Sequence, residues 1–195
     1  MKNYVLLLVA LVFLMIAPKA SAQDKSTTGL LDKAMALFEK GDHAGTAQAL
    51  TEGTAAIETE AKSSNGALKD KLLSKVGSLK SMIPLVSAGK LQSGILGKAI
   101  NAVKMLIGSN RISGLLGKGE SGLLGNAASL TSSLGLIKAG SSILGSDQQT
   151  SLNKLLGEAS KTSGEVDKKG VAGKVAATAA SKQLGSIVKL VSSAL

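Results

Sequence analysis

Residues 91–107 read LQSGILGKAINAVKMLI, and this stretch decides the fold class. Placed at about 100° per residue, as in an α-helix, its aliphatic side chains gather on one half of the helix and its polar side chains on the other. The aliphatic half holds Leu91, Ile95, Leu96, Ala99, Ile100, Ala102, Val103, Leu106 and Ile107. The spacing predicts an amphipathic helix that Gly108-Ser109-Asn110 interrupts. Its apolar half faces either the protein's own core or the headgroup plane of a membrane.

Upstream of this stretch the sequence predicts three further helices. Ser26-Thr27-Thr28 offers an N-cap for the first, which Gly41 ends, and the second runs over residues 42–63 with Asp42 as its cap. After a turn at residues 64–66, the third helix covers residues 67–82. Pro84 is expected to kink or end it.

Downstream, residues 112–145 are dense in Gly, Ser and Leu and are expected to be helical only in pieces. Asp147 is expected to cap a helix over residues 147–160, and residues 171–195 close the chain with another helix. No alternation of apolar and polar residues resembles a strand. The sequence therefore predicts an all-α protein, a bundle or array of amphipathic, Gly-rich helices.

The N-terminus has the pattern of a cleaved signal peptide. Lys2 is followed by an apolar run over residues 5–17 and by the small residues Ala20-Ser21-Ala22. The run has 13 residues, whereas a helix that crosses a bilayer needs about 20. We expect residues 1–22 to be removed, Gln23 to begin the mature chain, and the protein to be secreted or periplasmic. The alternative is an uncleaved N-terminal anchor.

Charge is divided unevenly along the chain. Residues 23–70 carry eight acidic and five basic residues, whereas residues 71–195 carry five acidic and 16 basic residues. Residues 71–118 contain no acid, and their basic residues are candidates for binding an anionic partner. They are Lys71, Lys75, Lys80, Lys90, Lys98, Lys104, Arg111 and Lys118. We expect an acidic helical hairpin (23–66), a basic Gly/Ser/Leu-rich region (67–160), a charged linker (161–170) and a C-terminal helix (171–195).

A short motif, Ser-Gly-(Ile/Leu)-Leu-Gly, occurs three times, and SSILG at residues 141–145 is a relic of it. In a helix each copy places two small residues at i and i+4, on one face, where two helix backbones can approach closely. These candidate packing residues are Ser93, Gly97, Ser113, Gly117, Ser121 and Gly125. They predict tight crossings within a bundle, or self-association between chains.

The usual constellations of catalytic and metal-binding residues are missing. The chain has no Cys and a single histidine, so the common zinc sites are excluded. His43 is more simply explained as a residue in the first turn of a helix capped by Asp42 than as a base held by that carboxylate. Nucleic-acid binding is disfavoured, because Arg111 is the only arginine and Phe38 the only aromatic residue after position 22. We predict a non-enzymatic protein without a cofactor.

Three functions remain open. The first is binding of an anionic lipid or envelope polymer through basic amphipathic helices, and the composition of residues 93–118 is similar to that of cationic, Gly/Leu/Lys-rich membrane-active peptides. The second is a self-associating scaffold. The third follows from residues 37–50, LFEKGDHAGTAQAL, which resemble the helix–turn–helix of a tetratricopeptide unit and imply a protein-interaction module. The small residue of that motif is shifted by one position, and no second copy follows about 34 residues on.

Overall fold

The computed structural model describes residues 27–62 and 68–195, which form helices joined by short turns. The α-helices are α2 (Thr27–Glu39), α3 (His43–Lys62), α4 (Lys69–Ser87), α5 (Ser93–Leu116), α6 (Ala127–Gly140), α7 (Ser146–Ser163) and α8 (Val171–Ala194). Two 3-10 turns, η1 (Glu120–Gly122) and η2 (Ser141–Ile143), flank α6. The all-α prediction is confirmed. The expected signal segment and the turn at residues 64–66 lie outside the described residues.

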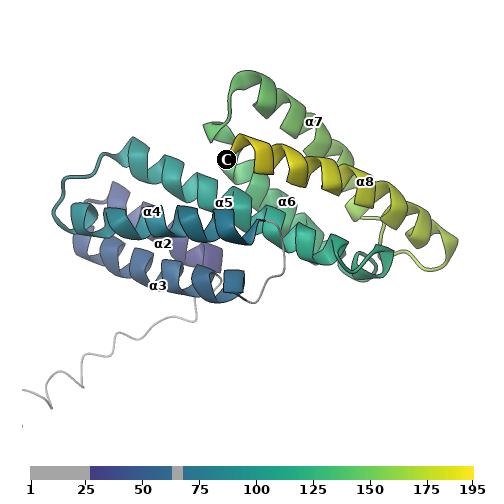
Figure 1. Ribbon diagram of the computed structural model, residues 1–195, viewed down its shortest axis with the longest axis horizontal. Helices are drawn as coiled ribbons and strands as arrows, with labels where there is room; N and C mark the ends of the chain where they lie inside the picture. The colour runs from purple at the N-terminus through teal and green to yellow at the C-terminus, as the bar shows by residue number, and fades with distance from the viewer. Residues whose placement is uncertain (1–26, 63–67) are drawn as a thin grey trace, which may run out of the picture.

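The helix α5 lies at the centre of the molecule (Figure 1). It packs against α2 and α4 on one side and against α6 and α8 on the other. The hairpin of α2 and α3 continues into α4, and α7 pairs with α8. Because neighbours surround its middle, α5 is buried without interruption from Ala102 to Asn110. The N-terminal and C-terminal groups of helices therefore share α5 as their common core element.

The expected interruption at Gly108-Ser109-Asn110 is wrong, because α5 continues through these residues to Leu116. The reason is the crossing of α5 by α6. A Cβ atom on Gly108 would lie 2.5 Å from the Ser133 backbone oxygen and 2.9 Å from Ile137 Cγ1. A glycine stands at position 108 because α6 leaves no room for a side chain, and not because the helix ends.

The end of α4 also differs from the prediction. The helix runs past Pro84 to Ser87 and thus ends five residues later than expected. Pro84 has no N–H to donate to the carbonyl one turn earlier in the helix, and α4 ends three residues after it. The chain turns at Gly89, whose φ is +65°, and the Lys90 N–H donates to the Leu85 oxygen at 2.9 Å. A left-handed glycine after the helix is therefore the structural stop.

The boundary between α2 and α3 was predicted correctly. Gly41 has a φ of +76°, a value that glycine adopts readily. Asp42 Oδ1 accepts a hydrogen bond of 2.8 Å from the Gly45 N–H, which is the expected N-cap. The predicted cap of α7 is wrong: α7 begins at Ser146 after Gly145, and Asp147 lies in its first turn.

The core is almost entirely aliphatic. Leu50, Ile57, Ile100, Leu106 and Ile187 are fully buried, and they represent a continuous cluster of Leu, Ile, Val and Ala that reaches from α2 to α8. Each buried Leu or Ile side chain stabilises the fold by about 1.5–3 kcal/mol relative to an exposed one. Stability therefore depends on many small aliphatic contacts.

Candidate anion-binding surface

Three of the eight candidate basic residues form ion pairs inside the protein. Lys80 Nζ lies 2.8 Å from Glu58 Oε1. Arg111 binds Glu60 through two bonds, Nε to Oε1 at 2.6 Å and Nη2 to Oε2 at 2.8 Å. Lys104 pairs with Asp32. All three acids belong to α2 and α3, so the acidic hairpin neutralises part of the basic region within the same chain.

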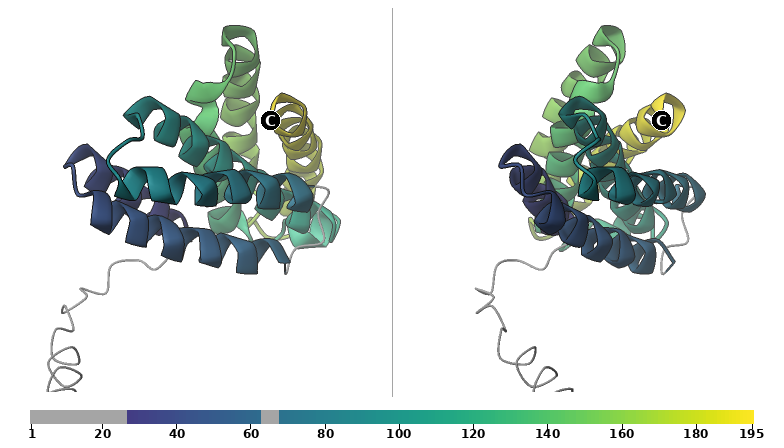
Figure 2. Two further views of the ribbon diagram at one scale, coloured as in Figure 1. Left: turned by 60° about the vertical axis from the view of Figure 1, so that its left-hand side comes forward. Right: turned by 90° about the vertical axis from the view of Figure 1, so that its left-hand side faces the viewer.

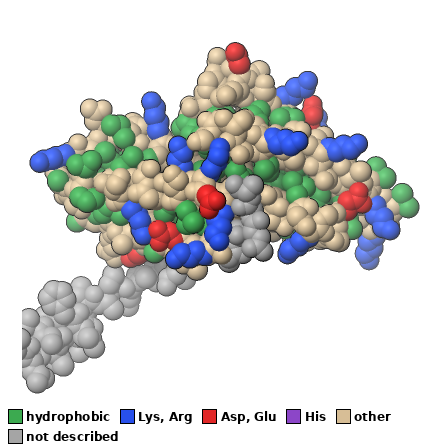
Figure 3. Space-filling model, viewed as in Figure 1, with side chains coloured by type: hydrophobic (Ala, Val, Ile, Leu, Met, Phe, Trp, Pro, Cys, Tyr) green, Lys and Arg blue, Asp and Glu red, His purple; other side chains and the backbone are tan. Residues whose placement is uncertain are grey.

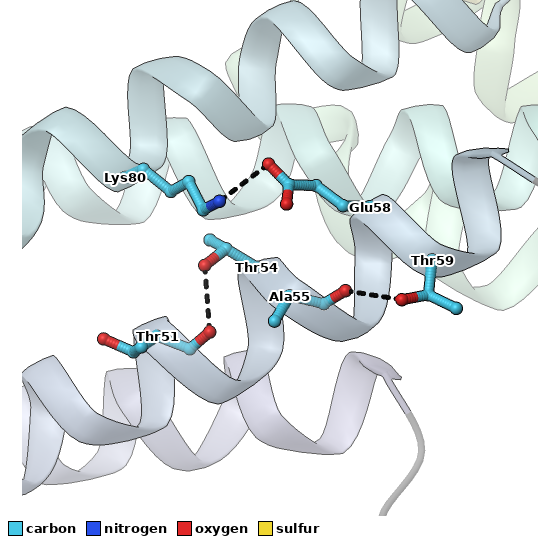
Figure 4. Close-up of polar contacts among 6 residues, drawn as sticks. All are labelled: Thr51, Thr54, Ala55, Glu58, Thr59 and Lys80. Carbon is cyan, nitrogen blue, oxygen red and sulfur yellow. Dashed lines mark hydrogen bonds and ion pairs between the residues drawn. The ribbon is translucent and has the colours of Figure 1, made fainter.

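Figure 4 shows how Glu58 reaches from α3 to Lys80 of α4. The threonines beside it bond within α3: Thr54 Oγ1 donates to the Thr51 oxygen at 3.1 Å, and Thr59 Oγ1 to the Ala55 oxygen at 3.0 Å. Among the residues drawn there, the carboxylate of Glu58 therefore makes the bond between helices.

The pairs of Lys104 and Arg111 differ from ordinary surface pairs in their burial. The Lys104 side chain is 10% exposed, whereas that of Asp32 is 63% exposed. The hydrogen bonds that Arg111 donates to Glu60 raise the pKa of Arg111, burial opposes this, and the negative charge of Glu60 adds to the rise. Both basic groups therefore serve to hold α5 against the hairpin.

The other five candidates form no ion pair among the described residues. Lys71 donates a hydrogen bond to the Ser192 backbone oxygen of α8, and Lys75 is half-buried. Lys90, Lys98 and Lys118 are exposed and have no ion-pair partner among the described residues. Lys98 lies in the first turns of α5, and Lys118 follows Gly117, the C-cap of that helix. Of the eight candidates, three are thus paired with acids of the hairpin, while Lys90, Lys98 and Lys118 remain as unpaired charges in the described structure.

The apolar half of residues 91–107 is core. Leu96, Ile100, Val103 and Leu106 are fully buried. Ile95, in the first turns of α5, is the exception with 46% exposure. Of the two environments that the amphipathic pattern allowed, the described structure shows the protein's own interior.

The six candidate packing residues lie mostly at helix ends. Ser93 and Gly97 occupy the start of α5, Ser113 lies in its last turn, and Gly117 is its C-cap. Ser121 belongs to η1, and Gly125, with a φ of +75°, forms the turn before α6.

Glycines that do lie at a close helix approach are found elsewhere, between α5 and α6. A Cβ atom on Gly140 would lie 2.4 Å from the Asn101 oxygen, and Gly108 is equally confined. Neither glycine belongs to the group of six, because a glycine at a crossing has no local sequence signal beyond its small size.

The sequence prediction did not include α8 among the basic candidates, although it presents an exposed basic face. Lys174, Lys182 and Lys189 are exposed, while Leu184 and Ile187 on the opposite face are fully buried. No acid occurs within α8. The absence of acids and the spacing of eight and seven residues were visible in the sequence. The face itself could be recognised only once the buried side of α8 was known.

His43 packs against neighbours rather than against reactive groups. Its ring meets the ring of Phe38 edge-on, with 5.9 Å between centroids. A Cβ atom on Gly89 would lie 3.2 Å from His43 Nε2, so the ring also fills the space beside the α4–α5 turn. Within the described ranges, no group of three or more His, Asp or Glu residues could hold a metal ion.

Comparison with known proteins adds no family. The chain matches no protein-family model, and no curated protein or solved structure resembles it significantly. None of the described helices combines the length and the apolar character that crossing a bilayer requires.

Proposed function

We propose that this chain is an exported, non-catalytic helical protein that binds an anionic partner of the cell envelope through exposed lysines. One observation carries the proposal: many surface lysines face solvent without a carboxylate within ion-pair distance among the described residues. Lys90, Lys98 and Lys118 represent them before, within and after α5, and Lys174, Lys182 and Lys189 in α8. Figure 3 shows Lys and Arg side chains spread over one face of the molecule with fewer acids between them.

These six lysines form no ion pair within the described part of the protein, so their charge remains available to a partner. The ion pairs of Lys80, Lys104 and Arg111 stabilise helix packing, and Lys168 pairs with Glu165 in the turn before α8. The remaining surface charge attracts an anionic surface over about a Debye length, roughly 8 Å at physiological salt. Binding by such a surface requires no cofactor and no reactive group.

Export is supported by the pattern of residues 1–22, a basic residue followed by an apolar run and an Ala-x-Ala site. The proposal predicts that protein recovered from the secretory compartment begins at Gln23. Intact-mass measurement of the recovered protein tests this directly, because a chain that keeps residues 1–22 contradicts the location.

The two other functions have weaker support. Self-association through the Ser-Gly-Leu-Leu-Gly repeats would require small residues aligned along one helix face, whereas Gly117 and Gly125 lie outside the α-helices. Residues 37–50 contribute the end of α2, the turn and the start of α3. A tetratricopeptide-like function would rest on this single hairpin.

Sedimentation with vesicles tests the binding proposal. We expect the protein to sediment with anionic vesicles, to stay in solution with neutral vesicles, and to be released as salt screens the lysines. Binding that does not respond to salt, or a failure to bind anionic vesicles at low salt, would contradict the proposal.

A further inference from the structure

We infer that the outward face of α8 is the surface that lies on an anionic lipid bilayer. This inference rests on the proposed function and names its surface and its partner. The α8 stripe consists of Val171, Lys174, Val175, Thr178, Lys182 and Lys189. At about 100° per residue, these side chains fall within a sector of roughly 100° and extend over about 27 Å of helix.

The position of α8 leaves this stripe accessible. α8 lies at the edge of the molecule in both views of Figure 2, with α7 beside it. Its inner face packs on the core through Ala177, Ala180 and Leu184, which are fully buried. The helix is therefore held as a rigid rod, with its lysines outward, before any partner binds.

The charge of the stripe favours an anionic partner. Its three lysines are exposed, and they have no ion-pair partner among the described residues. Among the described residues, one acid is hydrogen-bonded to the stripe: Glu120 of η1 accepts a bond of 2.6 Å from Thr178 Oγ1. The net charge of the stripe together with Glu120 remains positive.

Two valines distinguish a bilayer from a soluble polyanion. Val171 is 78% and Val175 is 64% exposed, more than Leu85 and Ile95 at 46% each, the other large hydrophobic residues that are exposed in the described structure. Apolar side chains beside lysines gain free energy when they enter the interface below the headgroups. A soluble polyanion offers the lysines the same charge but gives the valines no apolar environment.

Two triple variants that remove equal charge provide the test. K174Q/K182Q/K189Q removes the lysines of the stripe, and K90Q/K98Q/K118Q removes three exposed lysines elsewhere. Gln keeps the helix propensity of Lys, so both variants should retain wild-type helicity by circular dichroism. Each lysine near an anionic surface contributes about fivefold to binding, so the first triple should weaken partition into anionic vesicles about 100-fold at low salt. The second should weaken it less than about tenfold, through its more distant charges.

The outcomes separate the two proposals. If wild-type protein fails to bind anionic vesicles, the proposed function fails. If wild type binds and both triples lose affinity equally, the proposed function stands and the α8 stripe is refuted. If the stripe triple instead dissociates an oligomer seen by sedimentation velocity, a second copy of the chain occupies the stripe and the inference is overturned.

Two further variants test the lipid itself and the role of Glu120. V171S/V175S should lower vesicle binding while leaving binding to dextran sulfate unchanged. Equal binding of this variant and wild type to vesicles would overturn the assignment of a bilayer in favour of a soluble polyanion.

E120Q keeps an oxygen that can accept from Thr178 but removes the negative charge, so it should raise vesicle affinity up to about fivefold. A fall in the vesicle affinity of E120Q would contradict the inference that the bilayer lies against α8 beside Glu120.

Discussion

The helices α5 and α8 have the same length and the same charged residues in number and sign, but they lie in different environments. Each helix has 24 residues, three basic residues and no acid. α5 is buried on all sides through its middle, whereas α8 buries one face and presents its lysines to solvent. Two of the three basic residues of α5, Lys104 and Arg111, pair with acids of the hairpin. The corresponding pairs are absent from α8 within the described residues.

The difference shows that the charge of a segment does not reveal whether the charge faces a partner or the protein itself. In α5, neighbours from α2 and α3 bring Asp32 and Glu60 to the basic side chains. A charge that is drawn toward the interior must be paired, because a lone buried charge costs several kcal/mol. In α8 water solvates the lysines, and no such pairing is required.

The largest expected effect compares one aliphatic residue from each helix. Ile100 of α5 is fully buried, so Ile100→Asp places a carboxylate in an apolar core and should unfold the protein. Val175 of α8 is 64% exposed, and Val175→Asp should leave the fold intact. Circular dichroism with urea titration measures both.

A folded Ile100→Asp variant with an unchanged urea midpoint would mean that α5 is not the central helix. Loss of structure in Val175→Asp would place that residue in a core that the described residues do not contain. Either result would break the distinction between the two helices.

The second comparison concerns glycine. A Cβ atom on Gly108 of α5 would meet backbone of α6 at 2.5 Å, and backbone cannot move as a flexible side chain does. Gly108→Ala should therefore lower the free energy of unfolding by about 1–3 kcal/mol. Gly185 of α8 has open space around the same position, so Gly185→Ala should raise it by about 0.5–1 kcal/mol. A stabilising Gly108→Ala would contradict the close crossing of α5 and α6.

The parts of the fold that depend on local physics could be predicted from the sequence. Gly41 followed by Asp42 supplies a left-handed stop and an N-cap, and the α2–α3 boundary was predicted correctly from these residues. Gly108 was misread as an interruption of a helix, and the third helix was expected to end at residue 82 rather than at Ser87. The role of Gly108 depends on the crossing helix α6, which is remote in sequence, whereas the stop at Gly89 lies only five residues after Pro84.

For the candidate basic residues too, the local sequence was predictive and the packing partners were not. That residues 71–118 carry only basic charges was evident, but which of them meet Glu58, Glu60 or Asp32 depends on how α4 and α5 pack against the hairpin. The sequence predicts a helix over residues 171–195, but only its packing shows that Val175 is exposed while Leu184 and Ile187 are buried. Packing on one side of a helix determines which of its residues remain for a partner.

The smallest expected effect concerns the pair of Lys104 and Asp32, and it is asymmetric. Asp32→Asn leaves the charged Lys104 side chain, which is only 10% exposed, without its carboxylate. Because Asp32 itself is 63% exposed, we expect a modest loss of about 1 kcal/mol rather than the 3–5 kcal/mol of a fully buried pair. Lys104→Met removes the buried charge and keeps most of the aliphatic stem, while Asp32 remains solvated, so stability should change by less than about 0.5 kcal/mol.

Thermal unfolding of both single variants and of the double variant measures this asymmetry. With the pairing described for α5, Asp32→Asn should lose its effect once Lys104 is methionine, because no buried charge then requires a partner. Lys189→Gln in α8 is the matched control: the side chain is solvated and unpaired within the described structure, so stability should stay within about 0.5 kcal/mol of wild type. If Lys104→Met were as destabilising as Asp32→Asn, the basic residues of α5 would contribute through their charge beyond the single pair. In that case the description of α5 as a helix whose buried charges are neutralised by the hairpin would be wrong, whereas the description of α8 as a helix with solvated lysines would stand.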